Sequence, residues 1–124
     1  MKVSEAMTRE VRIAHPDQTI REAAAMMADI DAGVLPVGDD NRLLGMITDR
    51  DIVVRAVAKG MGPSARVEDV MTSEVKYCFD DEDTADVLAN LGEQQLRRLP
   101  VVNREKRLVG ILSLPEEPDP RRPT

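Results

Sequence analysis

The sequence is poor in aromatic residues and in cysteine. It contains no tryptophan, and phenylalanine and tyrosine occur once each, so an apolar core must be built from valine, leucine, isoleucine, methionine and alanine. The single cysteine, Cys78, cannot form an internal disulfide, which favours a reducing compartment. The length of 124 residues and the 42% hydrophobic content suit one compact domain.

Long apolar runs and an excess of positive charge are also lacking. No run approaches the roughly 20 residues that span a bilayer, and the first residues contain no apolar signal region. Seventeen basic residues against 23 acidic ones give a net charge of −6, which disfavours binding to nucleic-acid phosphates. We therefore expect a soluble cytoplasmic protein that binds neither a membrane nor nucleic acid.

Side chains suited to catalysis are few. His15 is the one histidine, and no second histidine or cysteine stands at metal-ligand spacing from it. The sequence shows no nucleophile paired with a base and no glycine-rich phosphate loop. We predict that the chain is not an enzyme, has no metal site and requires no cofactor.

Three blocks of the sequence occur twice in the same order. The first two pairs are separated by 64 residues, and the third by 65 because the second copy contains one inserted residue. The pairs are 3–8 with 67–72, 35–37 with 99–101, and 42–48 with 107–113. The chain is therefore two copies of one unit.

Helix signals occur at corresponding places in the two copies. Thr19, followed three residues later by a glutamate, is typical of a capping box that opens an amphipathic helix. Asp83 is the candidate N-cap of the corresponding helix in the second copy. A further helix is predicted over 49–59, closing at Gly60 or Gly62.

Strand signals complete the unit. Each copy contains two short apolar runs around a polar turn, and each run reads as a hairpin strand. The predicted hairpin strands are 34–37 with 44–48 and 99–102 with 108–112. Alternating apolar residues predict one more short strand before the first helix of each copy, at Val11 and Ile13 and over 75–79. Each copy is thus strand, helix, strand, strand, helix.

The duplicated motifs resemble the family of cystathionine-β-synthase (CBS) domains. The matching residues are Val-x-x-x-Met-Thr at 3 and 67 and Leu-Pro-Val at 35 and 99. Gly-Met-Ile-Thr-Asp-Arg-Asp at 45–51 is similar to the family's Gly-apolar-x-Thr/Ser-x-x-Asp signature. The resemblance covers about residues 1–114, and we regard it as specific because the motifs recur in order.

This resemblance implies an α+β fold in which two β-α-β-β-α repeats pack face to face as one pseudo-two-fold disc. We assign 1–62 to repeat 1, 63–114 to repeat 2 and 115–124 to a proline-rich disordered tail. The tail cannot continue as a helix, so the final helix of repeat 2 is predicted to be missing. The family commonly forms dimers, binds AMP, ADP, ATP or S-adenosylmethionine between its repeats, and regulates attached proteins.

Thr48 and Asp51 are the first candidates for ligand binding. A strand that ends at Thr48 and a helix that follows it place backbone N–H groups and a hydroxyl where a phosphate can bind. In the family, the residue matching Asp51 holds ribose and the residue matching Thr48 approaches phosphate. The same two residues also form a structural helix start, with Thr48 as N-cap and Asp51 at position N3. The sequence leaves both readings open.

Further candidates come from the resemblance. Arg97 and Arg98 precede a predicted buried strand, where the family often places a basic residue that reaches a phosphate. Their alternative role is to lie near a helix C-terminus, where cations are favourable. Arg50 is a further phosphate candidate or a solvated first-turn residue. Ile13 and His15 are expected to line the slot for the base.

The second copy departs from the pattern. Its signature contains Ser113, but Glu116 replaces the expected aspartate, and glutamate is one methylene longer. Ser113 and Glu116 therefore define a weaker second site. We predict one functional cleft per chain, built by Thr48 and Asp51 with help from Arg97 and Arg98.

Two functions remain from these observations. The first is a regulatory module that binds an adenine nucleotide or an S-adenosylmethionine-like ligand and forms a homodimer. We expect no output domain on this chain, so the module would act on a protein partner. The second is a dimerising, stress-associated or protein-interaction module that binds no ligand. Titration with nucleotides distinguishes the two.

Overall fold

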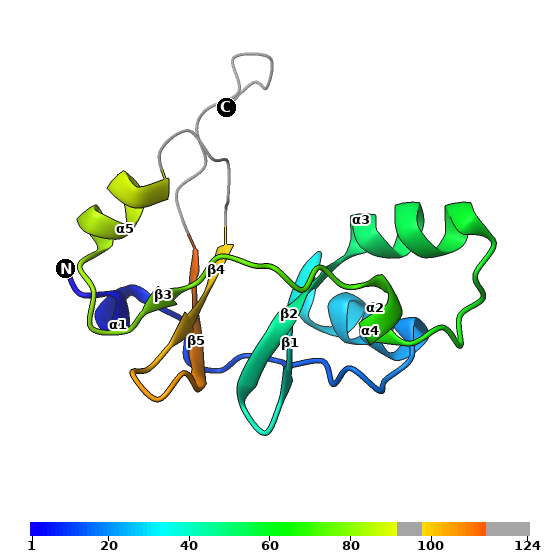
Figure 1. Cartoon of the computed structure of the whole chain (residues 1–124), viewed down its shortest axis with the longest axis horizontal. Coiled ribbons are helices and arrows are strands. Elements are labelled where there is room, and N and C mark those ends of the chain that lie inside the picture. Colours follow the sequence, from blue (N-terminus) through cyan, green and yellow to red (C-terminus); the bar gives the residue numbers. More distant parts are fainter. Residues whose placement is uncertain (92–97, 114–124) are drawn as a thin grey trace, which may run out of the picture.

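The structure, a computed structural model, describes residues 1–91 and 98–113. Its elements are short helices and short strands (Figure 1). In the first half these are α1 (Val3–Ala6), α2 (Ile20–Ile30), β1 (Val34–Asp39), β2 (Arg42–Thr48) and α3 (Asp49–Asp51), followed by a π-helical segment η1 (Ile52–Ala56) and a 3₁₀ segment η2 (Val57–Lys59). In the second half they are α4 (Val67–Val70), β3 (Cys78–Phe79), α5 (Thr84–Leu91), β4 (Arg98–Val102) and β5 (Leu108–Ser113).

The α+β class and the paired repeats predicted from the sequence are confirmed. Thr19 caps α2, because its hydroxyl oxygen accepts the N–H of Glu22 at 3.1 Å. Asp83 accepts the N–H of Ala85 at 2.9 Å at the start of α5. The helix predicted over 49–59 closes at Gly60 with a φ of +78°, but its middle is π-helical.

The four predicted hairpin strands form two antiparallel pairs. β1 pairs with β2, and β4 pairs with both β5 and the short parallel strand β3. The first hairpin turns at Asp40 and Asn41, whose positive φ angles of 51° and 63° are those of a two-residue hairpin turn that matches the strand twist. In the second hairpin the side chain of Asn103 accepts two backbone N–H groups and shapes the turn.

The strand predicted at Val11 and Ile13 does not form. Thr8 makes an isolated bridge to Ile111 of β5, whereas Ala14 makes one to Val37 of β1. The residues between these bridges pass from one sheet to the other, so they cannot follow the ladder of either. Only Ala14 is hydrogen-bonded to β1, through Pro36 and Gly38.

The backbone contacts between the two halves follow an internal two-fold relationship. Each bridge has a counterpart displaced by 64 or 65 residues, and one bridge is its own counterpart. The related pairs are Lys2–Asp83 with Thr19–Arg66, and Thr8–Ile111 with Met46–Thr72, and the self-related bridge is Arg42–Arg107. The pseudo-axis therefore passes between the two hairpins, near their turns.

Residues 3–8 of the first copy and 67–72 of the second pack against the other copy's sheet. In Figure 1, α1 lies beside β3, and α4 lies beside α2. Each of two buried apolar clusters contains residues of both copies, so the two copies exchange these segments. One comprises Ala14, Ile20, Ala23, Met27, Leu35, Val37, Ile47, Ala56, Val67 and Val70. The other comprises Val3, Met7, Cys78, Val87, Leu91, Leu99, Val101 and Leu112.

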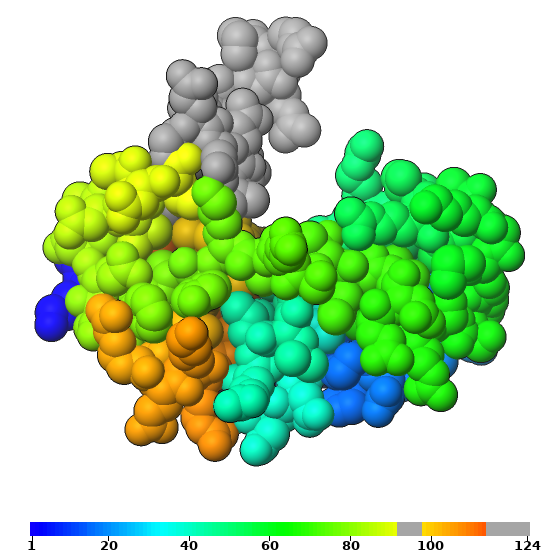
Figure 2. Space-filling view, viewed as in Figure 1, coloured from blue at the N-terminus to red at the C-terminus, as the bar shows by residue number. Residues whose placement is uncertain are grey.

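We call the two exchanged segments, 3–8 and 67–72, the openings. Val3 of the first opening and Val67 of the second are fully buried in the cluster of the other copy. The connecting segment after α4 then crosses the junction between the two units, visible as the green band in Figure 2. The chain is thus two units in space, and neither consists of one sequence repeat alone.

The predicted absence of a final helix and the proline-rich tail fall on residues 114–124, outside the described residues. Among the described helices, none is long and apolar enough to cross a bilayer.

Candidate ligand cleft at the repeat junction

A cavity of about 270 Å³ opens between the two units. We call residues 9–13, which pass from one sheet to the other, the crossing segment. The cavity walls come from Thr8, the crossing segment, the C-terminal end of α2, the start of β1 and the facing ends of β4 and β5. The lining residues are Thr8, Glu10, Val11, Arg12, Ile30, Asp31, Ala32, Val34, Leu35, Pro36, Arg98, Ile111 and Ser113. Both copies therefore contribute to one hollow, in which apolar side chains alternate with charged and hydroxyl-bearing ones.

Arg98 and Ser113 form the polar end of this cavity. They are partners in the β4–β5 register and are both exposed. Val34, the counterpart of Arg98 in the first copy, also lines the cavity and is the strand partner of Thr48. A guanidinium and a hydroxyl placed side by side suit a phosphate or carboxylate, because both donate hydrogen bonds to anionic oxygens.

The cavity lining contains a second arginine. Arg12 lines the cavity, and its guanidinium is paired with the carboxylate of Asp29 in the last turn of α2. Glu10 and Asp31 also line the cavity. Arg12 is therefore partly neutralised.

Thr48 and Asp51 form a helix start. The Thr48 hydroxyl oxygen accepts the N–H of Asp51 at 3.0 Å, and the N–H of Thr48 donates to Asp51 Oδ2 at 3.0 Å. The structural reading that the sequence left open is thus present as a reciprocal capping box. A binding role for the same two residues stays a prediction, and neither lines the cavity that contains Ser113.

Arg50 is exposed in the first turn of this helix. Its backbone N–H donates to Asp49 Oδ1 at 2.8 Å. The structure therefore leaves its side chain at the surface beside Thr48 and Asp51, and its predicted phosphate contact stays untested. Arg97 and Glu116 lie outside the described residues, so their predicted roles also stay predictions.

Ile13 and His15 are not brought to Thr48. Ile13 lies against Gly38, near the end of β1, whereas Thr48 pairs with Val34 at its beginning. Four residues of strand separate these two points, or about 13 Å. The predicted role of Ile13 and His15 in lining the slot for the base stays a prediction, and neither residue lines the cavity that contains Ser113.

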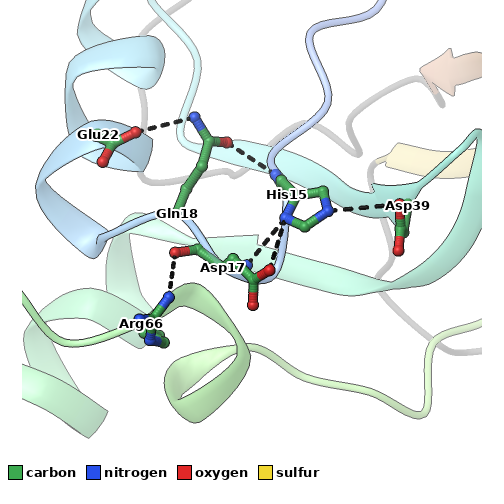
Figure 3. A network of polar contacts seen from close by, with 6 residues as sticks. All are labelled: His15, Asp17, Gln18, Glu22, Asp39 and Arg66. Atoms are coloured by element: carbon green, nitrogen blue, oxygen red, sulfur yellow. Dashed lines mark hydrogen bonds and ion pairs between the residues drawn. The ribbon is translucent and has the colours of Figure 1, made fainter.

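His15 instead takes part in a surface network (Figure 3). Its Nδ1 accepts the N–H of Asp17 at 3.1 Å, and its Nε2 lies 3.4 Å from Asp39 Oδ1. The backbone N–H of His15 donates to Gln18, and Arg66 donates to the carbonyl of Asp17 at 2.8 Å. These contacts fasten the turn before α2 to the first hairpin and to the segment before α4.

Several cavity residues were missed by the sequence analysis. Thr8, Val11 and Arg12 lie one to five residues before the predicted base slot, and Pro36 belongs to the Leu-Pro-Val motif that was read only as a strand. The signal was present in the duplication, since the opening that contains Thr8 has to pass over the strand that leads to Ser113. In the part of the chain that the structure describes, no group of three or more histidine, cysteine, aspartate or glutamate residues is placed to hold a metal ion.

Comparison with known proteins identifies the family. The model of the CBS domain matches residues 3–57 and again residues 67–115. The chain belongs to the CBS-domain family and contains two tandem CBS domains. It is 38% identical over 112 residues to the CBS domain-containing protein YhcV of Bacillus subtilis, covering 90% of this chain and 79% of that protein.

Solved structures with the same fold extend the comparison. Hypoxic Response Protein I, which is from Mycobacterium tuberculosis and was solved with two coordinated zinc ions, matches with a TM-score of 0.80 and 35% identity over 91% of this chain and 93% of that one. The CBS domain pair of MJ0100, in complex with 5′-methylthioadenosine and S-adenosyl-L-methionine, matches with a TM-score of 0.77 and 28% identity over 91% of this chain and 89% of that one. CBSX2 in complex with AMP matches with a TM-score of 0.77 and 29% identity over 90% of this chain and 89% of that one.

Proposed function

We propose that this protein is a regulatory module that binds an adenine nucleotide or a related adenosyl ligand in the cavity between its two CBS domains. The observation that carries the proposal is the placement of Arg98 and Ser113, from one copy, opposite apolar residues of the other copy around one hollow. Two solved relatives of the same fold bind AMP or adenosyl compounds, which supports this ligand class.

The cavity suggests how such a ligand is held. The base lies against the apolar wall that includes Val11, Val34 and Pro36, and the phosphate or carboxylate faces Arg98 and Ser113. The hydroxyl of Ser113 and the guanidinium of Arg98 donate hydrogen bonds to the anionic group. Arg97, predicted to help at Thr48 and Asp51, and Glu116, predicted to contribute to the weaker site with Ser113, stay predictions.

Regulation follows from the position of the cavity. A ligand there touches the crossing segment, one strand of the first sheet and two strands of the second, so its affinity depends on how the two units sit against each other. A ligand shifts that arrangement by as much as its affinities for the two states differ. In this proposal the module needs no cofactor and performs no reaction. A protein partner binds differently to the two arrangements of the units.

A second candidate function, dimerisation or docking without a ligand, is favoured by one observation. Val53, Val54 and Val57 on the helix over 49–59 are 58%, 45% and 63% exposed. A second copy of the chain covers this face in the homodimer that we propose. The buried, unpaired thiol of Cys78 fits the proposed cytoplasmic location.

The test is ligand-dependent thermal unfolding of the purified chain. AMP, ADP, ATP, S-adenosylmethionine and 5′-methylthioadenosine are compared, with titration calorimetry for any that stabilises the protein. A ligand at 100 times its dissociation constant adds about 2.7 kcal/mol to the free energy of unfolding. Loss of a charge-assisted hydrogen bond in Arg98→Ala is expected to weaken binding about 10- to 100-fold.

Arg21→Ala is the matched control. Arg21 is exposed on α2 and does not line the cavity, so its removal changes the net charge equally without touching the ligand. Binding that is lost in Arg98→Ala and kept in Arg21→Ala supports the proposal. If none of the five compounds raises the unfolding temperature at millimolar concentration, the ligand-binding proposal fails and the docking function stands.

A further inference from the structure

Arg55 joins two parts of the molecule that the sequence motifs treat separately. It lies in η1, one turn after Asp51, and its Nε is 3.7 Å from Asp51 Oδ1. Its Nη1 donates to the carbonyl of Met71 at 3.3 Å. A single side chain therefore links the carboxylate of the first CBS signature to the opening of the second copy.

Both carboxylate oxygens of Asp51 have a partner in the structure. Oδ2 accepts the N–H of Thr48, and Oδ1 faces the guanidinium of Arg55. The side chain of Asp51 is 14% exposed, and that of Arg55 is 48% exposed. A ribose hydroxyl that approaches Oδ1 competes with the guanidinium of Arg55 for that oxygen, whereas Oδ2 can keep its bond to the helix start.

The second contact of Arg55, with Met71, lies next to the residue that corresponds to the cavity-lining Thr8. Met71 precedes Thr72, which exchanges two backbone hydrogen bonds of 2.9 Å with Met46 of β2. By the internal two-fold relationship Thr72 corresponds to Thr8, and Thr8 lines the cavity at Ser113. Arg55 therefore contacts both Asp51, the predicted ribose acceptor, and Met71, the neighbour of Thr72.

We propose that Arg55 competes with an adenosyl ligand for Asp51, so that the Thr48 side of the module binds such a ligand more weakly than it would without the guanidinium. This inference rests on the proposed function. It makes the two sides of the module unequal, with the cavity at Ser113 as the stronger site and the side at Thr48 as the weaker one, which we call the latent side.

The size of the effect is bounded by the exposure of the pair. A partly exposed ion pair contributes at most about 1 kcal/mol, so removing the competitor tightens the latent side by about five-fold or less. Arg55→Gln is the informative change, because the shorter amide removes the charge that faces Asp51. Lys59→Gln is its control, since it removes one positive charge from an exposed position on the same helix.

The experiment is titration calorimetry with AMP on the full chain, carrying no substitution, Arg55→Gln, Lys59→Gln, or Arg55→Gln with Asp51→Asn. Thermal unfolding without ligand establishes that each variant is folded. We expect one strong site in the unsubstituted chain, a tighter second binding event in Arg55→Gln only, and loss of that gain in the double variant.

The outcomes separate this inference from the proposed function. If the unsubstituted chain binds AMP and Arg55→Gln binds it with the same stoichiometry and affinity, the competitor role is overturned and the proposed function stands. A gain that persists when Asp51→Asn is added also overturns it, because Asp51 would then not be the group released. If no variant binds AMP, both fail, and if Arg55→Gln alone binds it, the competitor role is supported and the cavity at Ser113 is not the binding site.

Discussion

The α-carbon of Gly45 lies directly under the carbonyl group of Thr72. A Cβ placed on Gly45 would be 2.5 Å from that carbonyl oxygen, and a Cβ on the equivalent Gly110 would be 2.7 Å from the carbonyl oxygen of Thr8. Each glycine therefore lets the Met-Thr end of an opening cross a strand of the other copy. This contact explains why the Met-Thr and glycine motifs occur together in both halves of the sequence.

Gly45→Ala and Gly110→Ala are expected to destabilise the fold. The new methyl group meets backbone atoms that cannot rotate away, and such overpacking costs about 1–3 kcal/mol. Urea unfolding monitored by circular dichroism measures the loss. Gly62→Ala is the control, since nothing lies within 4 Å of a Cβ there and its φ is not in the left-handed region. Equal stability of all three variants would contradict the close crossing.

The exchange of the openings predicts an effect of distant residues on each unit. Val67 is fully buried in the cluster of the first copy, so Val67→Ala should remove about 2 kcal/mol from the free energy of unfolding. The matched change in the exposed Val57, Val57→Ala, should have an effect within about 0.5 kcal/mol. Hydrogen exchange locates the loss, which we expect in α2 and β1. A loss confined to α5 and β4 would show that the openings are not exchanged.

The cap at the start of α3 predicts a structural cost without any ligand. Thr48→Ala removes the hydroxyl that accepts the N–H of Asp51, which should lower the unfolding free energy by about 1 kcal/mol. Thr48→Ser keeps the hydroxyl and should lose less than half of that. The measurement is thermal unfolding of the ligand-free chain. If Thr48→Ala and Thr48→Ser are equally stable, the hydroxyl does not cap the helix.

Cys78 gives the stability a defined dependence on pH. Burial, and secondarily the nearby carboxylate of Glu82, raise the pKa of the Cys78 thiol from 9.0 to about 11. Between those values the folded chain keeps the proton that the unfolded chain releases, so stability falls as the pH rises from about 9 to about 11. The full loss is at most about 2–3 kcal/mol.

Cys78→Ala tests this dependence. The variant should be less stable at neutral pH because the buried sulfur leaves a small void, but its unfolding free energy should fall less steeply between pH 9 and pH 11. Alkylation supplies a second measurement, because a buried and protonated thiol should react much more slowly in the native chain than in urea. Identical pH slopes for the two proteins would show that Cys78 does not titrate in this way.

The sequence predicted the parts of the fold that local patterns determine. The hairpins, the caps at Thr19 and Asp83 and the stop at Gly60 follow from alternation, side-chain hydrogen bonding and a positive φ, all of which act within a few residues. The α+β class and the CBS family followed from the duplication. The exchange of openings did not, because a segment such as 3–8 carries no local information about which copy its valine packs against.

The candidate site was harder to predict for the same reason. The sequence placed Arg98 with Thr48 and Asp51, but the structure pairs Arg98 with Ser113 in one ladder and surrounds both with residues of the first copy. The predicted role of His15 at the slot for the base stays a prediction, and its imidazole lies beside Asp39 of β1. Residues that meet across the pseudo-axis are set by the register of the two sheets, which no single motif contains.

The exchanged openings give the chain the geometry of a domain-swapped dimer. Each repeat contributes a buried helix to the core of the other repeat. Residues 60–66 join the two repeats, which would otherwise be two separate subunits. A single copy of the repeat has no partner for its own opening and would leave part of its core uncovered. A gene encoding one repeat could therefore produce a folded protein by pairing two identical chains, and duplication with fusion turns that pair into one molecule whose halves are free to diverge, as Arg98 and its counterpart Val34 have done.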